Sequence, residues 1–236
     1  NLLVADEGFD GVAIMLGCGF CSLAIDAAAH RCTAGAGALL SAAVREAARA
    51  GCSGLEFAVG TPGTIGGALR MNAGTRDEGI GMRVASVAVL QPDGAVVRRA
   101  GSDVEWGYRS TSFAPDEVIL GCELALSPGD PAAIRRAMDD KLARRKRTQP
   151  LGKPSCGSVF RNPEGGSAGA LIDGLGLKGA SVGGARVSDV HANFIVNEGG
   201  ATAADVRALI ELVQQKVLDA YGIELTLEVR LVGFGA

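Results

Sequence analysis

Glycine constrains this chain more than any other residue type, with 35 glycines among 236 residues and aromatic residues at only 4%. The glycines follow no three-residue period and 47% of the residues are hydrophobic, which excludes both a collagen-like and a disordered chain. Glycine allows left-handed backbone and a close approach of the backbone to a ligand or to other backbone. We therefore expect a globular protein of two domains that is rich in tight turns.

The charge pattern argues against a nucleic-acid or membrane protein. The net charge is -3, and the only dense basic run is Arg144, Arg145, Lys146 and Arg147. Such a run is either a solvated helix end or a local contact for an anion. No apolar stretch reaches the roughly 18 residues of a membrane span. We expect a soluble, cytoplasmic protein.

Six cysteines offer little sign of a metal or disulfide framework. Cys18 and Cys21 have C-x-x-C spacing, but no second pair and no nearby histidine completes a zinc site. A thioredoxin-like site would need a helix after the first cysteine, whereas Ser22 to Ile25 alternates like a strand. We expect no metal site and cysteines that are mostly small buried residues of a reducing compartment.

Hydrophobic periodicity predicts mixed helices and strands in the first part of the chain. Residues 11–37 are typical of short strands, with Val12, Ile14 and Leu16 alternating, and a helix is expected over 38–50. Further strands are predicted over 84–90, 95–99 and 117–125, the first two joined by a turn at 92–94.

A second set of signals places the domain boundary and the last elements. Asp130-Pro131 is a helix start that leads to the basic run and ends before Pro150. Thr202 to Asp205 resembles a capping box, and the helix it opens should end at Gly222. The following alternation over 223–231 predicts a strand in which Glu228 and Arg230 share the face opposite the core.

Three segments have compositions suited to chemistry. Residues 60–74 carry glycines and threonines whose N–H groups can form a concave nest for a diphosphate, although a structural glycine loop fits equally well. Arg109, between aromatic and hydroxyl side chains, suits a carboxylate, or anchors a loop by packing. The polar turn over 154–163 contains Ser158 but lacks the G-x-S-x-G pattern of a hydrolase, and His191 is the only realistic base.

In this order, the segments resemble the UDP-N-acetylenolpyruvoylglucosamine reductases, the MurB family. The resemblance covers nearly the whole chain and rests on these runs together: 1–8, 60–74, 108–113, 149–150, 154–163, 168–172, 176–179, 183–188, 191–197 and 228–230. It implies an α+β fold, with the second half of a PCMH-like FAD-binding domain over 1–126, a connecting helix over 127–149 and a smaller α/β substrate domain over 150–236. There is no room for the insertion of the longer family type, so the shorter type is expected.

The resemblance also implies an activity in peptidoglycan precursor synthesis. NADPH would reduce FAD, and hydride would then pass to the enolpyruvyl double bond of a nucleotide sugar, which gives UDP-N-acetylmuramate. Ser158, Arg109 and Glu228 match the catalytic set. The arginine and a protonated glutamic acid would stabilise an enolate-like species, and the serine would supply a proton to the adjacent carbon.

Further positions are carried over from the family. The cofactor-binding positions are Asn1, Gly60, Thr61, Pro62, Gly63, Thr64, Gly66, Gly67, Asn72, Ala73 and Gly74, and the substrate-binding positions are Tyr108, Arg145, Asn162, His191 and Arg230. The partner is a small nucleotide sugar, and a monomer is favoured although the sequence leaves the oligomeric state open.

The family carries a further flavin-binding subdomain that ends in a Gly-Ser-Asn loop, of which only Asn1 is present. The chain is therefore expected to be a processed or internal piece that binds FAD weakly or not at all. Two alternatives remain open: a fragment without flavin that only binds a UDP-sugar, and another FAD-linked oxidoreductase of the same fold that acts on a hydroxy acid.

Overall fold

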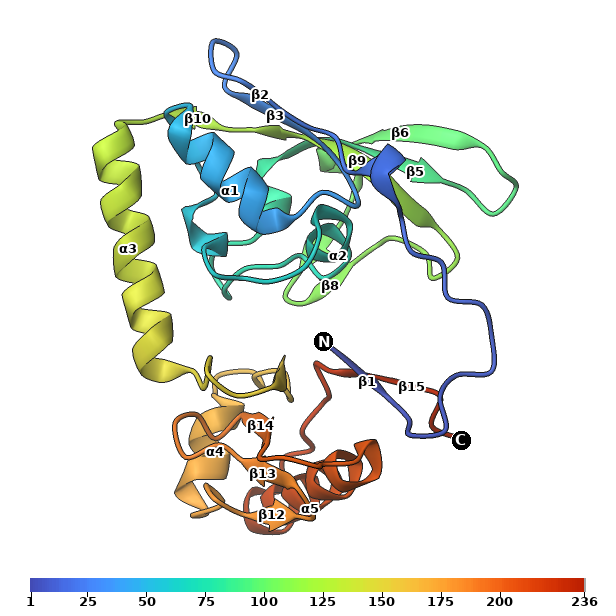
Figure 1. Cartoon of the computed structure of the whole chain (residues 1–236), viewed down its shortest axis with the longest axis vertical. Helices are drawn as coiled ribbons and strands as arrows, with labels where there is room; N and C mark the ends of the chain where they lie inside the picture. The colour runs from blue at the N-terminus through green and yellow to red at the C-terminus, as the bar shows by residue number, and fades with distance from the viewer. Residues whose placement is uncertain (236) are drawn as a thin grey trace. The chain divides into compact units, whose positions relative to one another are not determined.

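The computed structural model describes residues 1–235 and divides into two compact units (Figure 1). One unit consists of residues 14–144 and is called the N-terminal domain here. The other consists of residues 1–13 and 145–236 and is called the C-terminal domain.

An antiparallel sheet of five strands forms the centre of the N-terminal domain. Its strand order is β2 (Leu23–Asp26), β3 (Arg31–Gly35), β9 (Val118–Ala125), β5 (Val84–Leu90) and β6 (Val96–Ala100). The predicted hairpin is confirmed: β5 and β6 pair directly, and Gly94 in the turn has a φ of 87°. A positive φ at this position is why a glycine occupies the turn.

Two helices pack on this sheet and bury its apolar face. Figure 1 shows α1 (Leu40–Arg49) and α2 (Ile65–Arg70) on the same side of the sheet. The predicted apolar stripe of the first helix is confirmed at Ala43, Val44 and Ala47, which are buried in the core. Its fourth member, Leu39, is instead 58% exposed, because it precedes the helix in extended backbone and Leu40 is buried in its place. Short pieces complete the domain: η1 (Cys18–Phe20), β4 (Cys52–Ser53), η2 (Glu56–Ala58), η3 (Ile80–Arg83), η4 (Gly101–Asp103), β7 (Trp106–Gly107), β8 (Ser110–Thr111) and β10 (Ser127–Pro128).

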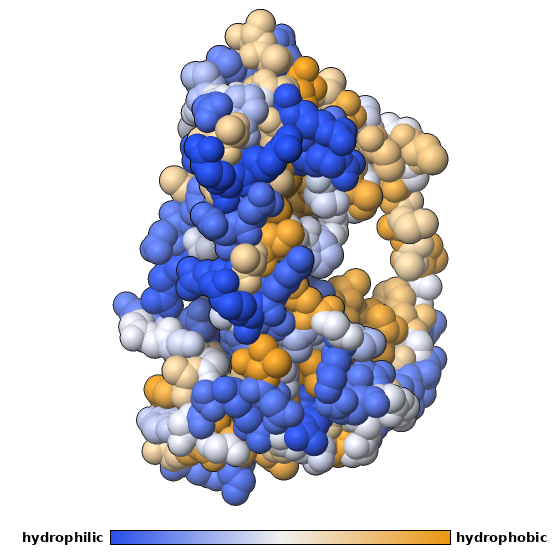
Figure 2. Space-filling model, turned by 60° about the vertical axis from the view of Figure 1, so that its left-hand side comes forward, coloured by the Kyte–Doolittle hydropathy of each residue, from blue (hydrophilic) through white to orange (hydrophobic). Residues whose placement is uncertain are grey.

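The helix α3 (Pro131–Thr148) carries the chain from one domain into the other. Its start is confirmed, because the Asp130 carboxylate accepts the N–H groups of Ala132 at 3.3 Å and Ala133 at 3.0 Å. Ile134 is its only fully buried residue among those described, and hydrophilic residues cover much of this side of the molecule (Figure 2). No helix within residues 1–235 combines the length and the apolar character needed to cross a membrane.

The C-terminal domain packs two helices on a four-stranded antiparallel sheet. The strand order is β11 (Ser155–Ser158), β14 (Phe194–Asn197), β13 (Ala185–Val187) and β12 (Ser181–Val182), and the helices are α4 (Ala168–Gly174) and α5 (Ala203–Tyr221). The predicted capping box is present: Thr202 accepts the Asp205 N–H, and the Asp205 carboxylate accepts the Thr202 N–H, both at 3.0 Å. Gly222 ends α5 in the left-handed conformation, with a φ of 65°.

The first residues of the chain belong to the C-terminal domain, which differs from the predicted boundary of 1–126. The strand β1 (Leu2–Val4) pairs in parallel with β15 (Arg230–Val232), and Asp6 accepts the N–H groups of Ala203 and Ala204 at the start of α5. Parallel pairing joins residues far apart in the chain, so local sequence patterns did not reveal it.

Two further strand predictions are corrected. Residues 12–16 form no strand, and Val12 and Ile14 are each 85% exposed, so their alternation does not mark a buried face. Of the predicted strand over 223–231, only Arg230–Val232 is regular. Residues before it make an isolated bridge between Leu227 and Phe160, because they follow an irregular path over the domain core.

Candidate active site

The glycine loop, residues 60–74, is tied to the chain before α1 and exposes its tip. Leu40 N–H donates to Gly63 O at 3.1 Å, and the N–H groups of Ile65 and Gly66 donate to Ala38 O and Ala36 O, both at 2.8 Å. A Cβ on Gly66 would lie 2.9 Å from the Cβ of Ala36, so Gly66 permits this close packing.

The tip of the same loop is open. Gly63 is exposed with a φ of 105°, and no atom lies within 4 Å of the position that its Cβ would occupy. Among residues 1–235 the N–H groups of Gly63 and Thr64 make no hydrogen bond, whereas Thr64 Oγ1 caps α2 by accepting the Gly67 N–H at 3.3 Å. Open glycine backbone with uncommitted donors fits the diphosphate of FAD.

The far end of the loop holds the hairpin that carries Arg109. The Asn72 amide donates to Gly107 O at 2.9 Å and accepts the Gly81 N–H at 3.0 Å, so this side chain serves the loop's own structure. The Arg109 guanidinium donates to Gly74 O at 2.8 Å. Residues of the predicted cofactor stretch are thereby joined directly to the predicted catalytic arginine.

Arg109 itself occupies an unusual backbone conformation. It lies in the two-residue turn between β7 and β8, with a φ of 54°, which is uncommon for a residue with a side chain. Its guanidinium carbon lies 5.2 Å from the centroid of the Tyr108 ring, and that of Arg76 lies 5.8 Å from the same ring. Stacking on Tyr108 and the bond to Gly74 orient the charge of Arg109.

In the C-terminal domain the fold brings Ser158 and Glu228 to neighbouring backbone segments. Ser158 ends β11, after a bulge at Gly157 with a φ of 85°. The next residue, Val159, accepts through its carbonyl the N–H of Glu228 at 2.8 Å. Glu228 is only 6% exposed, while Arg230 is exposed. The prediction that both lie on one solvent face is wrong, because the irregular path over 223–229 breaks the alternation of a strand.

Asn193, which was not among the predicted site residues, forms hydrogen bonds with the backbone of Val159 and Phe160 directly after Ser158. It is 4% exposed, and its amide accepts the Phe160 N–H at 2.9 Å and donates to Phe160 O at 2.8 Å. Its carbonyl also accepts the Val159 N–H at 2.9 Å. An asparagine within the otherwise apolar run 192–196 was the available signal, since a buried amide requires partners.

His191 is positioned by the same turn. Its Nδ1 accepts the Asn193 N–H at 3.2 Å, which leaves the proton of a neutral ring on Nε2. Burial, and then the positive charge of Lys178, lower the pKa of His191 and favour the neutral ring. His191 is thus arranged as a hydrogen-bond donor through Nε2.

The remaining predicted residues lie around these segments. Asn162 Oδ1 accepts the Ala168 N–H at 3.1 Å and so supports the start of α4. The Asn1 carbonyl accepts the Arg230 N–H at 2.7 Å, and Asn1 Oδ1 would lie 3.6 Å from a Cβ on Gly157. Asn1 therefore neighbours the Ser158 segment within its own domain. Burial lowers the pKa of Arg145 near the end of α3.

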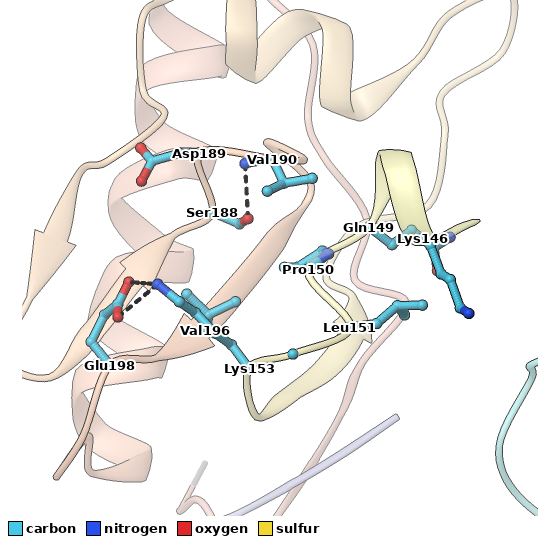
Figure 3. Close-up of a pocket in the computed structure, with 11 residues that line it drawn as sticks. Lys146, Gln149, Pro150, Leu151, Lys153, Ser188, Asp189, Val190, Val196 and Glu198 are labelled. Atoms are coloured by element: carbon cyan, nitrogen blue, oxygen red, sulfur yellow. Dashed lines mark hydrogen bonds and ion pairs between the residues drawn. The ribbon is translucent and has the colours of Figure 1, made fainter. Parts of the chain in front are cut away.

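A pocket of about 450 Å³ lies within the C-terminal domain (Figure 3). Its wall combines polar and apolar residues, with an ion pair between Lys153 and Glu198 at 2.6 Å. Lys146 and Ser188 add further polar groups, and the full lining is Lys146, Gln149, Pro150, Leu151, Gly152, Lys153, Ser188, Asp189, Val190, Val196 and Glu198. Of these residues, the sequence had suggested only Lys146, as part of a basic run that could contact an anion.

The expectation that the cysteines are mostly buried is wrong for Cys18 and Cys21, and Cys156 is half-buried. Cys32, Cys52 and Cys122 are buried, and burial raises the pKa of Cys32 to about 11 and of Cys122 to about 12, so these thiols are unreactive. Cys18 and Cys21 are exposed. No group of three or more potential metal ligands occurs within residues 1–235.

Comparisons with known proteins give these features a context. Residues 1–99 match the model of the FAD binding domain family, and residues 149–232 match that of the UDP-N-acetylenolpyruvoylglucosamine reductase C-terminal domain. The chain is 47% identical to the UDP-N-acetylenolpyruvoylglucosamine reductase of Heliobacterium modesticaldum over 99% of its own length and 74% of that protein. The corresponding enzyme of Synechococcus sp. WH7803 is 46% identical, with 99% and 77% covered.

A solved structure has the same fold. The crystal structure of UDP-N-acetylenolpyruvylglucosamine reductase (MurB) from Thermus caldophilus aligns with a TM-score of 0.84 and 39% identity, over 98% of this chain and 82% of that one. The match to an FAD-binding domain, together with the match to the C-terminal domain of a reductase, defines an FAD-dependent oxidoreductase. Within that class, the chain belongs to the UDP-N-acetylenolpyruvoylglucosamine reductase family, and it is shorter than the relatives it matches. The C-terminal match gives no support to a hydroxy-acid oxidase.

Proposed function

We propose that the chain reduces UDP-N-acetylenolpyruvoylglucosamine to UDP-N-acetylmuramate, a step in peptidoglycan precursor synthesis, with FAD as cofactor and NADPH as reductant. Family membership supports the reaction and the match to an FAD-binding domain supports the cofactor. One observation carries the proposal: Glu228 N–H and Val159 O are 2.8 Å apart, so the backbone pairs the predicted acid with the segment of Ser158.

The chemistry places distinct demands on the three residues. Bound FAD, once reduced by NADPH, would supply the hydride that adds to the enolpyruvyl double bond. Negative charge then moves toward the substrate carboxylate, where fixed opposite charge or a proton donor stabilises it. For this charge we assign the role of guanidinium to Arg109 and the role of acidic group to Glu228. Ser158 donates its hydroxyl proton to the adjacent carbon, which requires a strongly basic intermediate because a serine hydroxyl is a weak acid.

The orientation of Arg109 suits a group that must act without rearranging. Its bond to Gly74 O, at 2.8 Å, and its stack on Tyr108 restrict the side chain before substrate arrives. An arginine oriented beforehand stabilises developing charge at a smaller entropic cost than a mobile one. The link to Gly74 also makes Arg109 sensitive to changes in the glycine loop.

Nucleotide-sugar binding is proposed for Tyr108, Arg145, Asn162, His191 and Arg230. The neutral ring of His191, with its proton on Nε2, suits a donor to a sugar or phosphate oxygen. The pocket of Figure 3 is lined by sequence neighbours of two of these residues, since Lys146 follows Arg145 and Val190 precedes His191. Its volume of about 450 Å³ is within the usual range for small-molecule sites.

Two anaerobic half-reactions test the proposal. After FAD is added, NADPH should bleach the flavin absorbance, and UDP-N-acetylenolpyruvoylglucosamine should restore it with formation of UDP-N-acetylmuramate. Reoxidation by a 2-hydroxy acid's oxo product in place of the nucleotide sugar would contradict the proposal. UDP-sugar binding without any flavin binding would instead identify a binding protein.

A further inference from the structure

The exposed pair Cys18 and Cys21 lies in a tight turn that packs on the support of the glycine loop. Cys21 N–H donates to Cys18 O at 3.1 Å, closing the 3₁₀ turn η1. A turn of this kind keeps its first and fourth Cα atoms within about 7 Å, close to the 4.4–6.8 Å found in disulfides. Both thiols are free and exposed. The turn therefore holds the Cα atoms of two exposed cysteines near the separation that a disulfide needs.

The Cys21 thiol also holds its surroundings together. Its single S–H can donate to Gly17 O, at 3.4 Å from Sγ, or to Gly37 O, at 3.5 Å, and Sγ would lie only 3.1 Å from a Cβ on Gly37. The backbone repeats this connection, because Gly37 N–H donates to Phe20 O at 2.9 Å. The turn is thus attached to Gly37 through both side chain and backbone.

Gly37 lies between the two residues that hold the glycine loop. Ala36 O accepts the Gly66 N–H and Ala38 O accepts the Ile65 N–H, both at 2.8 Å. All these residues belong to the N-terminal domain. A change at Cys21 therefore reaches the hydrogen bonds of the glycine loop through a single intervening residue.

We propose that Cys18 and Cys21 form a reversible dithiol–disulfide pair that is oxidised by low-molecular-weight disulfides such as oxidised glutathione and whose state controls how firmly the glycine loop is held. One thiolate attacks oxidised glutathione and releases the first glutathione, leaving a mixed disulfide. The second thiol attacks the protein sulfur of that mixed disulfide and releases the second glutathione. The protein loses two hydrogens, and one oxidised glutathione becomes two reduced ones.

Oxidation should loosen the loop. A disulfide has no S–H group, so the hydrogen bond that Cys21 donates to Gly17 O or Gly37 O is lost. Leu40, Ile65 and Gly66 donate the hydrogen bonds that join the loop to its support, so their amide protons report its stability. The consequence for FAD rests on the proposed function, whereas the disulfide and the loosening do not.

The test treats the full chain with oxidised glutathione, then measures its intact mass and amide hydrogen exchange. We expect a loss of two hydrogen masses mapped to one peptide that contains both cysteines, reversed by dithiothreitol. Exchange of the Leu40, Ile65 and Gly66 amides should become about fivefold faster, a coupling of ordinary size between linked sites. The Kd for FAD should rise by about the same factor.

Two variants separate the thiol pair from other effects. Cys18→Ser keeps the Cys21 donor and cannot form the internal disulfide. Its amide hydrogen exchange at Leu40, Ile65 and Gly66 should therefore match that of the reduced parent chain. Oxidised glutathione should add at most a mixed disulfide that dithiothreitol removes. Cys21→Ala lacks the donor and should exchange at the faster rate even when reduced.

Absence of the internal disulfide, or its formation with unchanged exchange at all three amides, overturns the proposal. If the disulfide forms and the amides exchange faster, but FAD binds in neither redox state, the proposal for the thiol pair is supported. That result would instead contradict the idea that the glycine loop binds FAD. The two ideas can therefore fail separately.

Discussion

Replacing Gly67 by alanine distinguishes a glycine needed for ligand access from one needed for packing. Gly67 is exposed in α2, and its Cβ would meet nothing closer than Thr64 Oγ1 at 3.6 Å, an ordinary contact. Its φ is not in the left-handed region. Alanine favours a helix over glycine by about 0.8–1.0 kcal/mol in a helix interior, so the variant should be about 0.5–1 kcal/mol more stable at this position in the first turn. For a chain of this size that corresponds to a rise in Tm of about 2 °C.

FAD affinity should change in the opposite direction. If the exposed backbone of the glycine loop receives the diphosphate, the added methyl group prevents close approach and removes about one hydrogen bond to a charged group. Such a bond contributes about 1.5–3 kcal/mol, so the Kd for FAD should rise by about ten- to a hundredfold. Thermal unfolding without ligand and titration of FAD fluorescence measure the two effects independently.

Matched controls come from other glycines. Gly66→Ala places a Cβ 2.9 Å from the Cβ of Ala36 and should lower stability by about 1–3 kcal/mol through overpacking. Gly152 lies in the C-terminal domain, and a Cβ added to it would meet no atom within 4 Å. Gly152→Ala should therefore change neither the Tm nor the Kd for FAD. An unchanged Kd for Gly67→Ala would refute the diphosphate assignment, and a lower Tm would refute the packing argument.

Other predictions concern the catalytic serine, the buried amide and one buried carboxylate. Ser158→Ala should leave flavin reduction by NADPH unchanged and slow substrate reduction about 10²–10⁴-fold in stopped-flow absorbance, because one proton donor is lost; slowing of both half-reactions would contradict this role. Asn193→Ala leaves the buried N–H and C=O of Phe160 without their partner, which should cost about 2–5 kcal/mol in urea unfolding; a cost below 1 kcal/mol would show that water or another group replaces the amide. Burial alone would raise the pKa of Glu117, but hydrogen bonds from Arg99 and Gln91 outweigh it and lower that pKa. The ionised Glu117 therefore adds to the free energy of unfolding above the ordinary glutamic acid pKa of about 4.3, and this contribution is lost as the pH falls through the lowered pKa. The free energy of unfolding of a Glu117→Gln variant should accordingly fall less between pH 5 and pH 2 than that of the parent chain.

Helix ends and one hairpin were predictable from the sequence because their determinants are local. The starts of α3 and α5 follow from Asp130 and Thr202, and the end of α5 follows from Gly222. The β5–β6 hairpin follows from the turn around Gly94. In each case the residues that make the stabilising hydrogen bonds lie within a few positions of one another, so the pattern alone identifies them.

Local patterns failed where the environment of a strand is set by distant segments. Val12 and Ile14 alternate with less apolar residues yet lie exposed with no strand partner. Glu228 was predicted on a solvent face, but pairing of residues 226–230 with 159–161 and with Asn1 turns it into a buried position. Alternation specifies which residues share a face only when a regular strand forms, and pairing partners decide whether it does.

By itself the sequence determined the residue types of the candidate site, the order of the segments that carry them and the family to which the chain belongs. Only the tertiary structure decided that Glu228 is buried beside the Ser158 segment, that Asn193 holds this arrangement, and that Arg109 is tied to Gly74. It also decided that, within the glycine loop, Gly66 packs closely against Ala36 while Gly63 is exposed. The physical reason is common to all of these: each depends on hydrogen bonds or contacts between residues more than twenty positions apart, which local propensity does not encode.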